Sequence, residues 1–346
     1  MDSDARKRLI LRNTEEVVTE PELDDVLDRT AQPRVYIGLA PTGEMHIGHF
    51  TTIRKLADFL DADLAVTVLI ADLHAHLDDE KSPFDLLEAR SAYYQAAIES
   101  MIEAAGSDPT AVDFVRGTEF ELEPPYTLEL FRLAAETTIS RAQRAGSEVV
   151  RQSENPKLGG LLYTLMQSLD VAALDADIAY GGLDQRGIYM YARETLPDFG
   201  HGKPLCLFAP LLSGLSGEKM SASVRESTVS LTDDPDRIAE NVNGAYCPAG
   251  EVEGNGVLEY LRYLVFPILD DRDEAFVVER PDEYGGDVVY DDYASLEADF
   301  VSGELHPQDM KQATGVALAT VLEPIRERFA TEPELLADAY PETYRQ

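Results

Sequence analysis

The sequence contains no tryptophan and only two cysteines in 346 residues. Cys206 and Cys247 lie far apart and form no C-x-x-C pair, so neither a disulfide framework nor a thiolate zinc site is expected. No apolar run reaches the ~18 residues of a membrane span, and the N-terminus lacks the apolar core of a signal peptide. These absences predict a reduced, cytoplasmic protein with no membrane partner.

Basic residues are also scarce. The chain has 29 Lys and Arg against 65 Asp and Glu, a formal net charge of −36. Because nucleic-acid binding usually needs a basic surface, two accounts compete. Either the chain has no nucleic-acid partner, or it works in molar salt, where the Debye length is only ~3 Å and self-repulsion is screened. The dispersed acidic residues, the scarce lysine and the absent tryptophan favour the second account, which predicts that the protein loosens at low salt.

The residues that are present include a strand, a turn and a helix around which the chain is organised. Val35–Leu39 is an apolar run typical of a buried strand, and Pro41 and Gly43 mark a turn. A helical stripe follows, with its apolar positions at Ile53, Leu56, Ala57 and Leu60. This order places backbone N–H groups and a positive helix end at the mouth of a parallel sheet, where a phosphate can bind.

Two histidines lie at the start of that helix. His46 and His49 are three residues apart, so on a first helical turn they face the same side and each can donate to a phosphate oxygen. Gly48 between them leaves room for a flat ring against the backbone. Alone, the four residues are a weak signal. Far downstream, however, lies a glycine-rich loop with a lysine, Gly214–Ser223, and the pair of motifs resembles the two signatures of class I aminoacyl-tRNA synthetases.

Further apolar runs, at 64–71, 112–116, 177–182 and 203–209, predict the other strands of a parallel sheet. Helical patterns at 85–105, 126–144 and 161–170 alternate with them, and the chain after residue 227 is mainly helical. The fold class is therefore α/β, with a Rossmann-type domain at 1–227 and a helical domain at 228–346. His74 and His76 are spaced like metal ligands on a strand, but a strand end that opens on the active-site crevice explains them better, and no metal site is assigned.

Two stretches carry polar side chains at informative spacings. Tyr163, Gln167 and Asp170 project from one face of an apolar helix, where burial is costly unless something hydrogen-bonds to them. The segment around Arg141 and Arg144 is locally basic in a very acidic chain, which suits either a contact with an RNA end or a solvated helix face.

Nearly the whole chain resembles the tyrosyl-tRNA synthetases of the archaeal and eukaryotic type, here from a halophilic archaeon. The resemblance is carried by the segments YIGLAPTGEMHIGH, ADLHA, SENPK, YTLMQSLD, GGLDQR, KMSAS, AYCPAG and ELHPQD. It implies a catalytic domain with a connective insertion at about 121–160 that forms a homodimer, and a lysine loop at 214–226. It also implies that the helical domain reads the anticodon of tRNA(Tyr).

The resemblance further implies the substrates, which are L-tyrosine, ATP with Mg²⁺, and tRNA, and the residues that bind them. The catalytic residues are His46, His49 and Lys219. The tyrosine-binding residues are Tyr36, Tyr163, Gln167, Asp170 and Gln185. The ATP-binding residues are Gly38, Thr42, His46, Gly48, His49, Lys219, Met220, Ser221, Ala222 and Ser223. The tRNA-binding residues are Arg141, Arg144, Arg186, His306, Pro307 and Asp309.

The sequence departs from the family pattern at two positions. Ala222 replaces the second lysine of the common loop, which removes one cationic contact to the phosphates. Gln143 stands where relatives are often basic, which weakens the case for acceptor-stem contacts by that helix. The start of the segment at His306 could equally be a helix N-cap.

Three other functions compete with this one. A tryptophanyl-tRNA synthetase shares fold and motifs, but an indole offers only a donor, whereas Tyr36 together with Asp170 suits a phenol. A non-catalytic, synthetase-like RNA-binding protein would not need His46, His49 and Lys219. A small-molecule nucleotidyltransferase would not need the helical domain.

Overall fold

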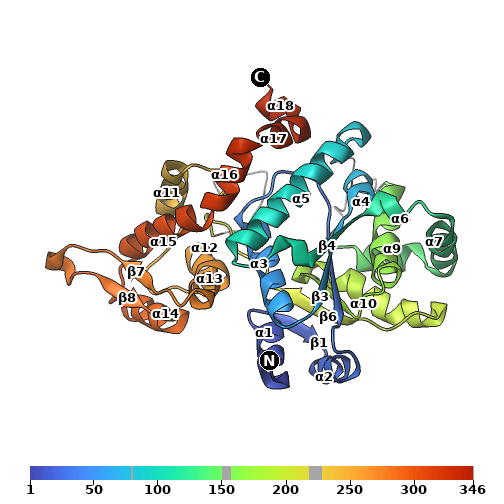
Figure 1. Ribbon diagram of the computed structural model, residues 1–346, viewed down its shortest axis with the longest axis horizontal. Helices are drawn as coiled ribbons and strands as arrows, with labels where there is room; N and C mark the ends of the chain where they lie inside the picture. The colour runs from blue at the N-terminus through green and yellow to red at the C-terminus, as the bar shows by residue number, and fades with distance from the viewer. Residues whose placement is uncertain (79–80, 150–156, 218–227, 346) are drawn as a thin grey trace.

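The computed structural model describes residues 1–78, 81–149, 157–217 and 228–345 (Figure 1). At its centre lies a six-stranded sheet in the order β1-β6-β5-β2-β3-β4. The strands are β1 Glu16–Val18, β2 Arg34–Leu39, β3 Ala65–Ile70, β4 Val112–Arg116, β5 Ile178–Gly182 and β6 Leu205–Ala209. All neighbours are parallel except β1 and β6. The strand order reverses between β2 and β5, which confirms the Rossmann-type fold and locates the crevice where such sheets bind ligands.

The sheet is covered on both faces because its strands alternate strictly. In β2, Val35 and Ile37 belong to a core shared with α3 (Ile47–Asp61) and α5 (Leu87–Ala104). Tyr36 points the other way, into a core shared with α9 (Leu158–Ala173) and α10 (Arg186–Thr195). The period of two thus directs Tyr36, unlike its neighbours Val35 and Ile37, toward the face that carries Asp170.

The first thirty residues contain more than the helical lead-in that the sequence predicts. Helix α1 is Ser3–Leu11 and α2 is Glu20–Arg29, and Thr19 and Glu22 form a capping box at the start of α2. Between the two helices, β1 pairs antiparallel with β6 at the sheet edge. With three residues β1 is too short to show a period, so only the pairing with β6 reveals it.

The segment between β3 and α9 corrects two predictions. Residues 72–76 are not the end of a strand but part of helix α4 (Asp72–Leu77). The single helix expected at 126–144 is two helices, α7 (Pro124–Glu136) and α8 (Ile139–Ala145). They separate where the side chain of Thr138 caps α8 by accepting from the Arg141 backbone N–H at 3.3 Å. A short helix, α6, occupies Gly117–Phe120.

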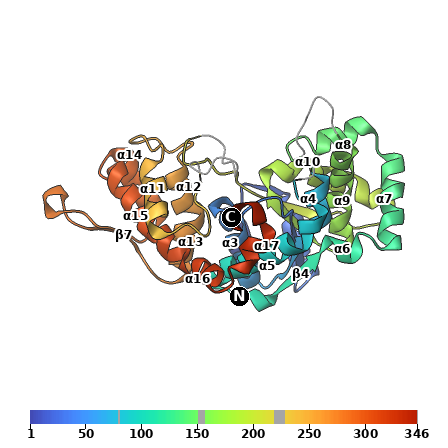
Figure 2. The ribbon, with the colours of Figure 1, turned by 90° about the horizontal axis from the view of Figure 1, so that it is seen from above.

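The chain after residue 227 is mainly helical, as predicted, and adds a two-stranded hairpin. Its helices are α11 Pro235–Gly244, α12 Gly256–Tyr260, α13 Phe266–Asp271, α14 Tyr293–Ser302, α15 Pro307–Val321, α16 Glu323–Thr331, α17 Glu334–Ala339 and α18 Pro341–Tyr344. The hairpin strands are β7 Phe276–Val278 and β8 Val288–Tyr290. Both views show an elongated molecule, with this hairpin at one end and α7 at the other (Figures 1 and 2).

Single turns join these elements. The 3-10 turns are at Phe84–Leu86, Pro109–Ala111, Leu183–Gln185, Leu196–Phe199 and Asp282–Tyr284, and a π-helical turn occupies Leu261–Val265. Across the described ranges, none of the helices has both the length and the apolar composition that crossing a bilayer requires.

The last helices return to the first part of the chain. Helices α16 and α17 pack against α5. Buried Arg90 on α5 fixes this contact, because its Nε donates to the Ala339 carbonyl at 3.1 Å and its guanidinium lies 4.8 Å from the centre of the Tyr340 ring. The predicted boundary near residue 228 therefore separates two parts that remain tightly joined through the chain end.

Candidate active site

The two motif histidines cap the helix that they begin. The backbone N–H of Gly48 donates to Nδ1 of His46, and the backbone N–H of His46 donates to Nδ1 of His49, both at 3.1 Å. Burial lowers the pKa of His46 to about 2 and that of His49 to about 4, so both rings are neutral near pH 7. Because each Nδ1 accepts, each ring must carry its proton on Nε2.

This geometry corrects the prediction of unpaired amides at the helix start. The N–H of Gly48 is taken by His46, and the N–H of Ile47 donates to the Val229 carbonyl at 3.0 Å. The donors that remain for an incoming phosphate are the Nε2–H groups of the two rings, whose centres are 4.2 Å apart. The histidines, rather than the backbone, are thus equipped to contact an oxyanion.

A cavity of about 530 Å³ opens beside His46. Thr42 and Gly43 of the turn line one side, and Ser230 and Arg237 line another. Residues 219–223, the lysine-loop part of the predicted ATP site, lie outside the described residues. Of the predicted ATP-binding residues, the structure brings Thr42 and His46 to this cavity, and Gly48 and His49 lie on the first turn behind it.

A cluster of buried polar side chains lies on the other face of the sheet, where β2 and β5 are neighbours. Tyr36 and Asp170 are both buried there, and the charge of Asp170 acts on the Tyr36 hydroxyl. Neither Tyr36 Oη nor Asp170 Oδ2 has a hydrogen-bond partner among the described residues. A Cβ at Gly38 would lie 2.7 Å from Tyr36 Oη, so this glycine makes room for the hydroxyl instead of serving only a nucleotide.

The remaining predicted tyrosine-binding residues lie beside the same buried cluster. The amide of Gln167 donates to Oε1 of Gln185 at 2.7 Å, which joins α9 to the turn after β5. Tyr163, one turn before Gln167, is buried with its ring edge-on to His74 at 4.7 Å between centres. The polar face of α9 is therefore buried toward partners, as its spacing predicts.

Three residues beside this cluster, Tyr126, His74 and Glu121, were not predicted to belong to the tyrosine site. The Tyr126 hydroxyl donates to Asp170 Oδ1 at 2.6 Å. His74 lies between two carboxyls, with Nε2 3.4 Å from Asp170 Oδ2 and Nδ1 3.4 Å from Glu121 Oε1. His74 was singled out in the sequence, but for a strand-type pairing with His76. No metal site was assigned to that spacing, and on α4 the His76 ring contacts the Ser82 carbonyl at 3.0 Å.

Comparison with known proteins identifies the family. The family model of class I tRNA synthetases for tryptophan and tyrosine matches residues 28–323. The chain belongs to these class I synthetases. Two curated relatives are tyrosine–tRNA ligases of the halophilic archaea Natronomonas pharaonis and Haloarcula marismortui. They are 67% and 68% identical over 344 residues, which cover 99% of this chain and 100% and 99% of theirs.

Solved structures agree with this assignment. The tyrosyl-tRNA synthetase of Archaeoglobus fulgidus in complex with L-tyrosine has a TM-score of 0.89 at 42% identity, covering 94% of this chain and 99% of its own. The Pyrococcus horikoshii enzyme with L-tyrosine has 0.90 at 31%, covering 98% and 99%. A tryptophanyl-tRNA synthetase of Plasmodium falciparum, 15% identical with 0.70 over 98% of this chain and 92% of its own, shares the fold alone. The family activity is amino-acid activation and tRNA charging.

The predicted tRNA-binding residues of the synthetase are dispersed. Arg186 pairs with both carboxylate oxygens of Glu16, at 2.6 and 2.9 Å. Arg141 pairs with Glu194 at 3.0 Å, and Arg144 donates to its own helix at the Ser140 carbonyl, at 3.3 Å. An RNA phosphate would therefore have to displace acidic side chains from Arg186 and Arg141.

The other predicted RNA site lies at the start of α15. His306 is the N-cap of this helix, and its Nδ1 accepts from the Gln308 backbone N–H at 3.1 Å. Pro307 is the first helical residue and Asp309 lies in the first turn. The capping role that the sequence left open is thus realised, and the His306 side chain remains exposed on the surface.

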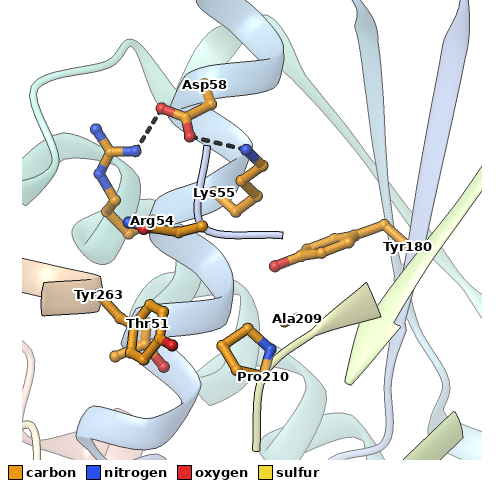
Figure 3. Close-up of a pocket in the computed structure, with 9 residues that line it drawn as sticks. Thr51, Arg54, Lys55, Asp58, Tyr180, Ala209, Pro210 and Tyr263 are labelled. Atoms are coloured by element: carbon orange, nitrogen blue, oxygen red, sulfur yellow. Dashed lines mark hydrogen bonds and ion pairs between the residues drawn. The ribbon is translucent and has the colours of Figure 1, made fainter. Parts of the chain in front are cut away.

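The helix that carries the motif histidines is anchored at its far end by a buried ion cluster (Figure 3). Lys55 Nζ donates to Asp58 Oδ2 at 3.0 Å and to the Leu9 and Arg12 carbonyls at 2.6 Å each. Arg54 bonds both Asp58 and, on α13, Asp271. The cluster of Arg12, Arg54, Lys55, Asp58 and Asp271 is called the Asp58 cluster below. It joins α1, α3 and the helical part of the synthetase.

Proposed function

We propose that this synthetase activates L-tyrosine with ATP, giving tyrosyl-adenylate and pyrophosphate, and then transfers the tyrosyl group to the 3′ end of tRNA(Tyr) in the cytoplasm. One observation carries the choice of amino acid. A buried hydroxyl and a buried carboxylate oxygen, Tyr36 Oη and Asp170 Oδ2, interact electrostatically, and neither has a hydrogen-bond partner among the described residues.

A phenol is the ligand that completes this pair. Its hydroxyl donates to the Asp170 carboxylate and accepts from Tyr36, so one group satisfies both. Phenylalanine would leave the two protein groups unpaired in a desolvated site, which costs ~1–3 kcal/mol for each. At the other end of the amino acid, Tyr163, Gln167 and Gln185 hold the α-ammonium group. The bond between Gln167 and Gln185 and the packing of Tyr163 on His74 keep these side chains in place.

The chemistry needs positioning and charge stabilisation, with no covalent enzyme intermediate. The tyrosine carboxylate attacks the α-phosphorus of ATP, and pyrophosphate leaves. The Nε2–H groups of His46 and His49 donate to phosphate oxygens as charge develops in the transition state, with Lys219 adding a cation and Ser221 and Ser223 adding hydroxyl donors. ATP arrives as its Mg²⁺ complex, so the cation comes with the substrate and no protein ligand is assigned to it.

We assign activation to residues 1–227 and anticodon recognition to 228–346, where His306, Pro307 and Asp309 present polar groups at a helix start. Residues 121–160 form the dimer interface. In support, α7 lies at one end of the molecule (Figure 2), and four large apolar side chains on α7, just before it and on α8 are exposed where a partner would cover them. These are Leu122, Leu128, Phe131 and Ile139, each more than half exposed. Light scattering in molar salt tests the dimer, and Phe131→Asp should give monomers.

Pyrophosphate exchange, measured separately with tyrosine, tryptophan and phenylalanine in molar salt, tests the activity. Exchange with tyrosine alone supports the proposal. Exchange with tryptophan would favour the tryptophanyl enzyme, and none with any amino acid would favour a non-catalytic RNA-binding protein. Charging of tRNA(Tyr) then tests the second step.

A further inference from the structure

Three buried ionisable groups form a row, and the proposed function uses only one of them, Asp170. Glu121 on the turn after α6, His74 on α4 and Asp170 on α9 are each at most 3% exposed. The imidazole lies between the carboxyls, with each ring nitrogen 3.4 Å from one of them. This row is called the Asp170 cluster below. The other titratable groups that face it are Asp72, Tyr36, Tyr126, Tyr163 and Tyr189.

The geometry limits the arrangements of protons that the row can hold with one net negative charge. A neutral imidazole has one N–H and one lone pair, so a lone pair that faces an ionised carboxylate would be repelled. The carboxyl on that side must then be protonated and donate to the nitrogen. If the imidazole is instead doubly protonated, both carboxyls are ionised. Both arrangements contain the same protons and carry one net negative charge, which spares the interior a second uncompensated anion.

The surroundings decide where the extra proton lies. Asp170 has a second donor, the Tyr126 hydroxyl at 2.6 Å, which stabilises its ionised form. Glu121 has no donor besides His74 among the described residues, and both its oxygens are buried. Its carboxyl rests against Gly117, where a Cβ would come within 2.7 Å. The negative charge therefore belongs on Asp170 and the proton on Glu121.

We propose that Glu121 is a neutral acid in the folded synthetase and donates its proton to Nδ1 of His74, so that the imidazole directs its Nε2–H at Asp170. Glu121 and His74 are positioning residues. They orient the Asp170 carboxylate, which accepts from the substrate phenol. They also keep Asp170 as the one charged group of the row, so that it accepts from Tyr126, His74 and the substrate together. This inference rests on the proposed function of Asp170.

The pKa directions agree with this placement. Burial raises the pKa of Glu121, and the charge of Asp170 raises it further. Burial lowers the pKa of His74 to about 3, so the ring is neutral near pH 7. Burial raises the pKa of Asp170 as well, but there the bond from Tyr126 opposes it.

A metal ion would explain the row less well. The ligand atoms of the three residues lie within 4.8 Å of one another. However, the ring nitrogens that face the two carboxyls are on different sides of the imidazole. An ion bound at one ring nitrogen would have only the carboxyl on that side as a further ligand. The other carboxyl would still face the second ring nitrogen.

The test compares Glu121→Gln, Glu121→Ala and the control Glu123→Gln, whose side chain is exposed two residues away. A carboxamide N–H replaces the donated proton, so Glu121→Gln should bind tyrosine within roughly threefold of wild type. Glu121→Ala leaves Nδ1 unpaired beside a void and should weaken binding about tenfold or more. The control should match wild type.

A second readout does not depend on activity or on the alanine variant folding. The infrared spectrum of the wild-type protein near pH 7 should show the carbonyl stretch of a protonated carboxyl, retained in Glu123→Gln and lost in Glu121→Gln. The inference is overturned if Glu121→Gln weakens tyrosine binding as much as Glu121→Ala, if no such band is lost, or if the protein holds a stoichiometric metal ion that Glu121→Gln releases. Failure of wild-type exchange with tyrosine would instead reject the proposed function, and the infrared result would still decide the position of the proton.

Discussion

Two buried aspartates of the synthetase, Asp58 on α3 and Asp170 on α9, lie in opposite electrostatic settings. Asp58 and Asp170 are both at most 1% exposed, so burial alone would raise the pKa of each. The pKa of Asp58 is nevertheless lowered, because Lys55, Arg54 and Arg12 outweigh burial. The pKa of Asp170 is raised, because only a neutral hydroxyl opposes burial there.

The difference lies in how completely each cluster is satisfied. In the Asp58 cluster, Lys55 donates to three acceptors and Asp58 receives three cations. In the Asp170 cluster, Asp170 receives only the neutral Tyr126 hydroxyl and faces the His74 ring, with no cation beside it among the described residues. Both oxygens of Asp58 are paired with cations, although Arg54 Nε has no partner among the described residues, and the cluster joins helices. A carboxylate that meets neutral donors alone keeps an acceptor position that a substrate hydroxyl can use.

Asp58→Ala should have the largest effect, because it leaves Arg54 and Lys55 buried without their shared carboxylate. Breaking such a buried group costs about 3–5 kcal/mol. Denaturant unfolding in molar salt measures this loss, and Asp61→Ala, at an exposed position on the same helix, should stay within about 0.5 kcal/mol of wild type. Equal losses of stability in Asp58→Ala and Asp61→Ala would show that the buried Asp58 cluster stabilises the fold no more than an exposed aspartate does.

Asp170→Asn should act on binding instead of folding. The substrate hydroxyl loses its charged acceptor, which lowers tyrosine affinity by ~1–3 kcal/mol, or about 5- to 150-fold. Selection against phenylalanine should relax, while stability does not fall as it does in Asp58→Ala, since a buried charge is removed. Exchange kinetics with both amino acids measure this, and unchanged discrimination would contradict the assigned role of Asp170.

The pH dependence of stability should differ between the clusters. The folded pKa of Glu121 is raised, so above its usual value of 4.5 the folded state binds more protons than the unfolded state. Its contribution to stability therefore declines as pH rises above 4.5. Glu121→Gln abolishes this titration. The Tm of the variant should therefore rise relative to that of wild type as the pH increases from 5 to 9, by about 2–4 °C for each kcal/mol of stability that the wild type loses. A constant difference across that range would show that Glu121 is ionised in the folded chain.

The depressed pKa of Asp58 has the opposite sign. Its contribution is present above its usual value of 3.8 and is lost as pH falls through the lower, folded pKa. The stability gap between wild type and Asp58→Ala should therefore narrow only in strong acid. Thermal unfolding between pH 2 and pH 7 measures it, and a gap that narrows already near neutrality would contradict the assignment.

Lowering salt should give the smallest difference between the clusters. The formal net charge of −36 makes the whole molecule less stable as the Debye length grows from ~3 Å at 1 M to ~10 Å at 0.1 M. The buried clusters are screened far less, so the gap between wild type and Asp58→Ala should change by less than about 0.5 kcal/mol. A gap that follows salt would place the Asp58 cluster in contact with solvent.

Much of the fold follows from local pattern. Apolar runs locate five of the six strands because parallel strands are buried on both faces. The spacing of Tyr163, Gln167 and Asp170 predicts one polar helix face because a helix repeats every 3.6 residues. The motif around His46 and His49 predicts a strand, turn and helix, and the structure has them. The missed β1 and the break at Thr138 have no periodic signal.

Only about half of the residues around Asp170 could be predicted from the sequence. Residues on β2 and α9 carry recognisable patterns, whereas Glu121 and Tyr126 are ordinary residues on a turn and a helix whose importance appears only across space from Asp170. His74 drew attention in the sequence through its spacing from His76. A helix replaces the expected strand end there, and His74 lies beside Asp170 and Glu121 instead. The capping of α3 by its own histidines likewise depends on side-chain rotation, which no spacing encodes.

The sequence by itself determined five of the six sheet strands, the acidic composition and the two motifs, because each depends on neighbours along the chain. Only the tertiary structure decided the charge on each buried group. Asp58 and Asp170 are the same residue type on similar helices, and what separates them is which side chains from distant segments meet their oxygens. Protonation is set by distance in space, and that distance exists only once the chain has folded.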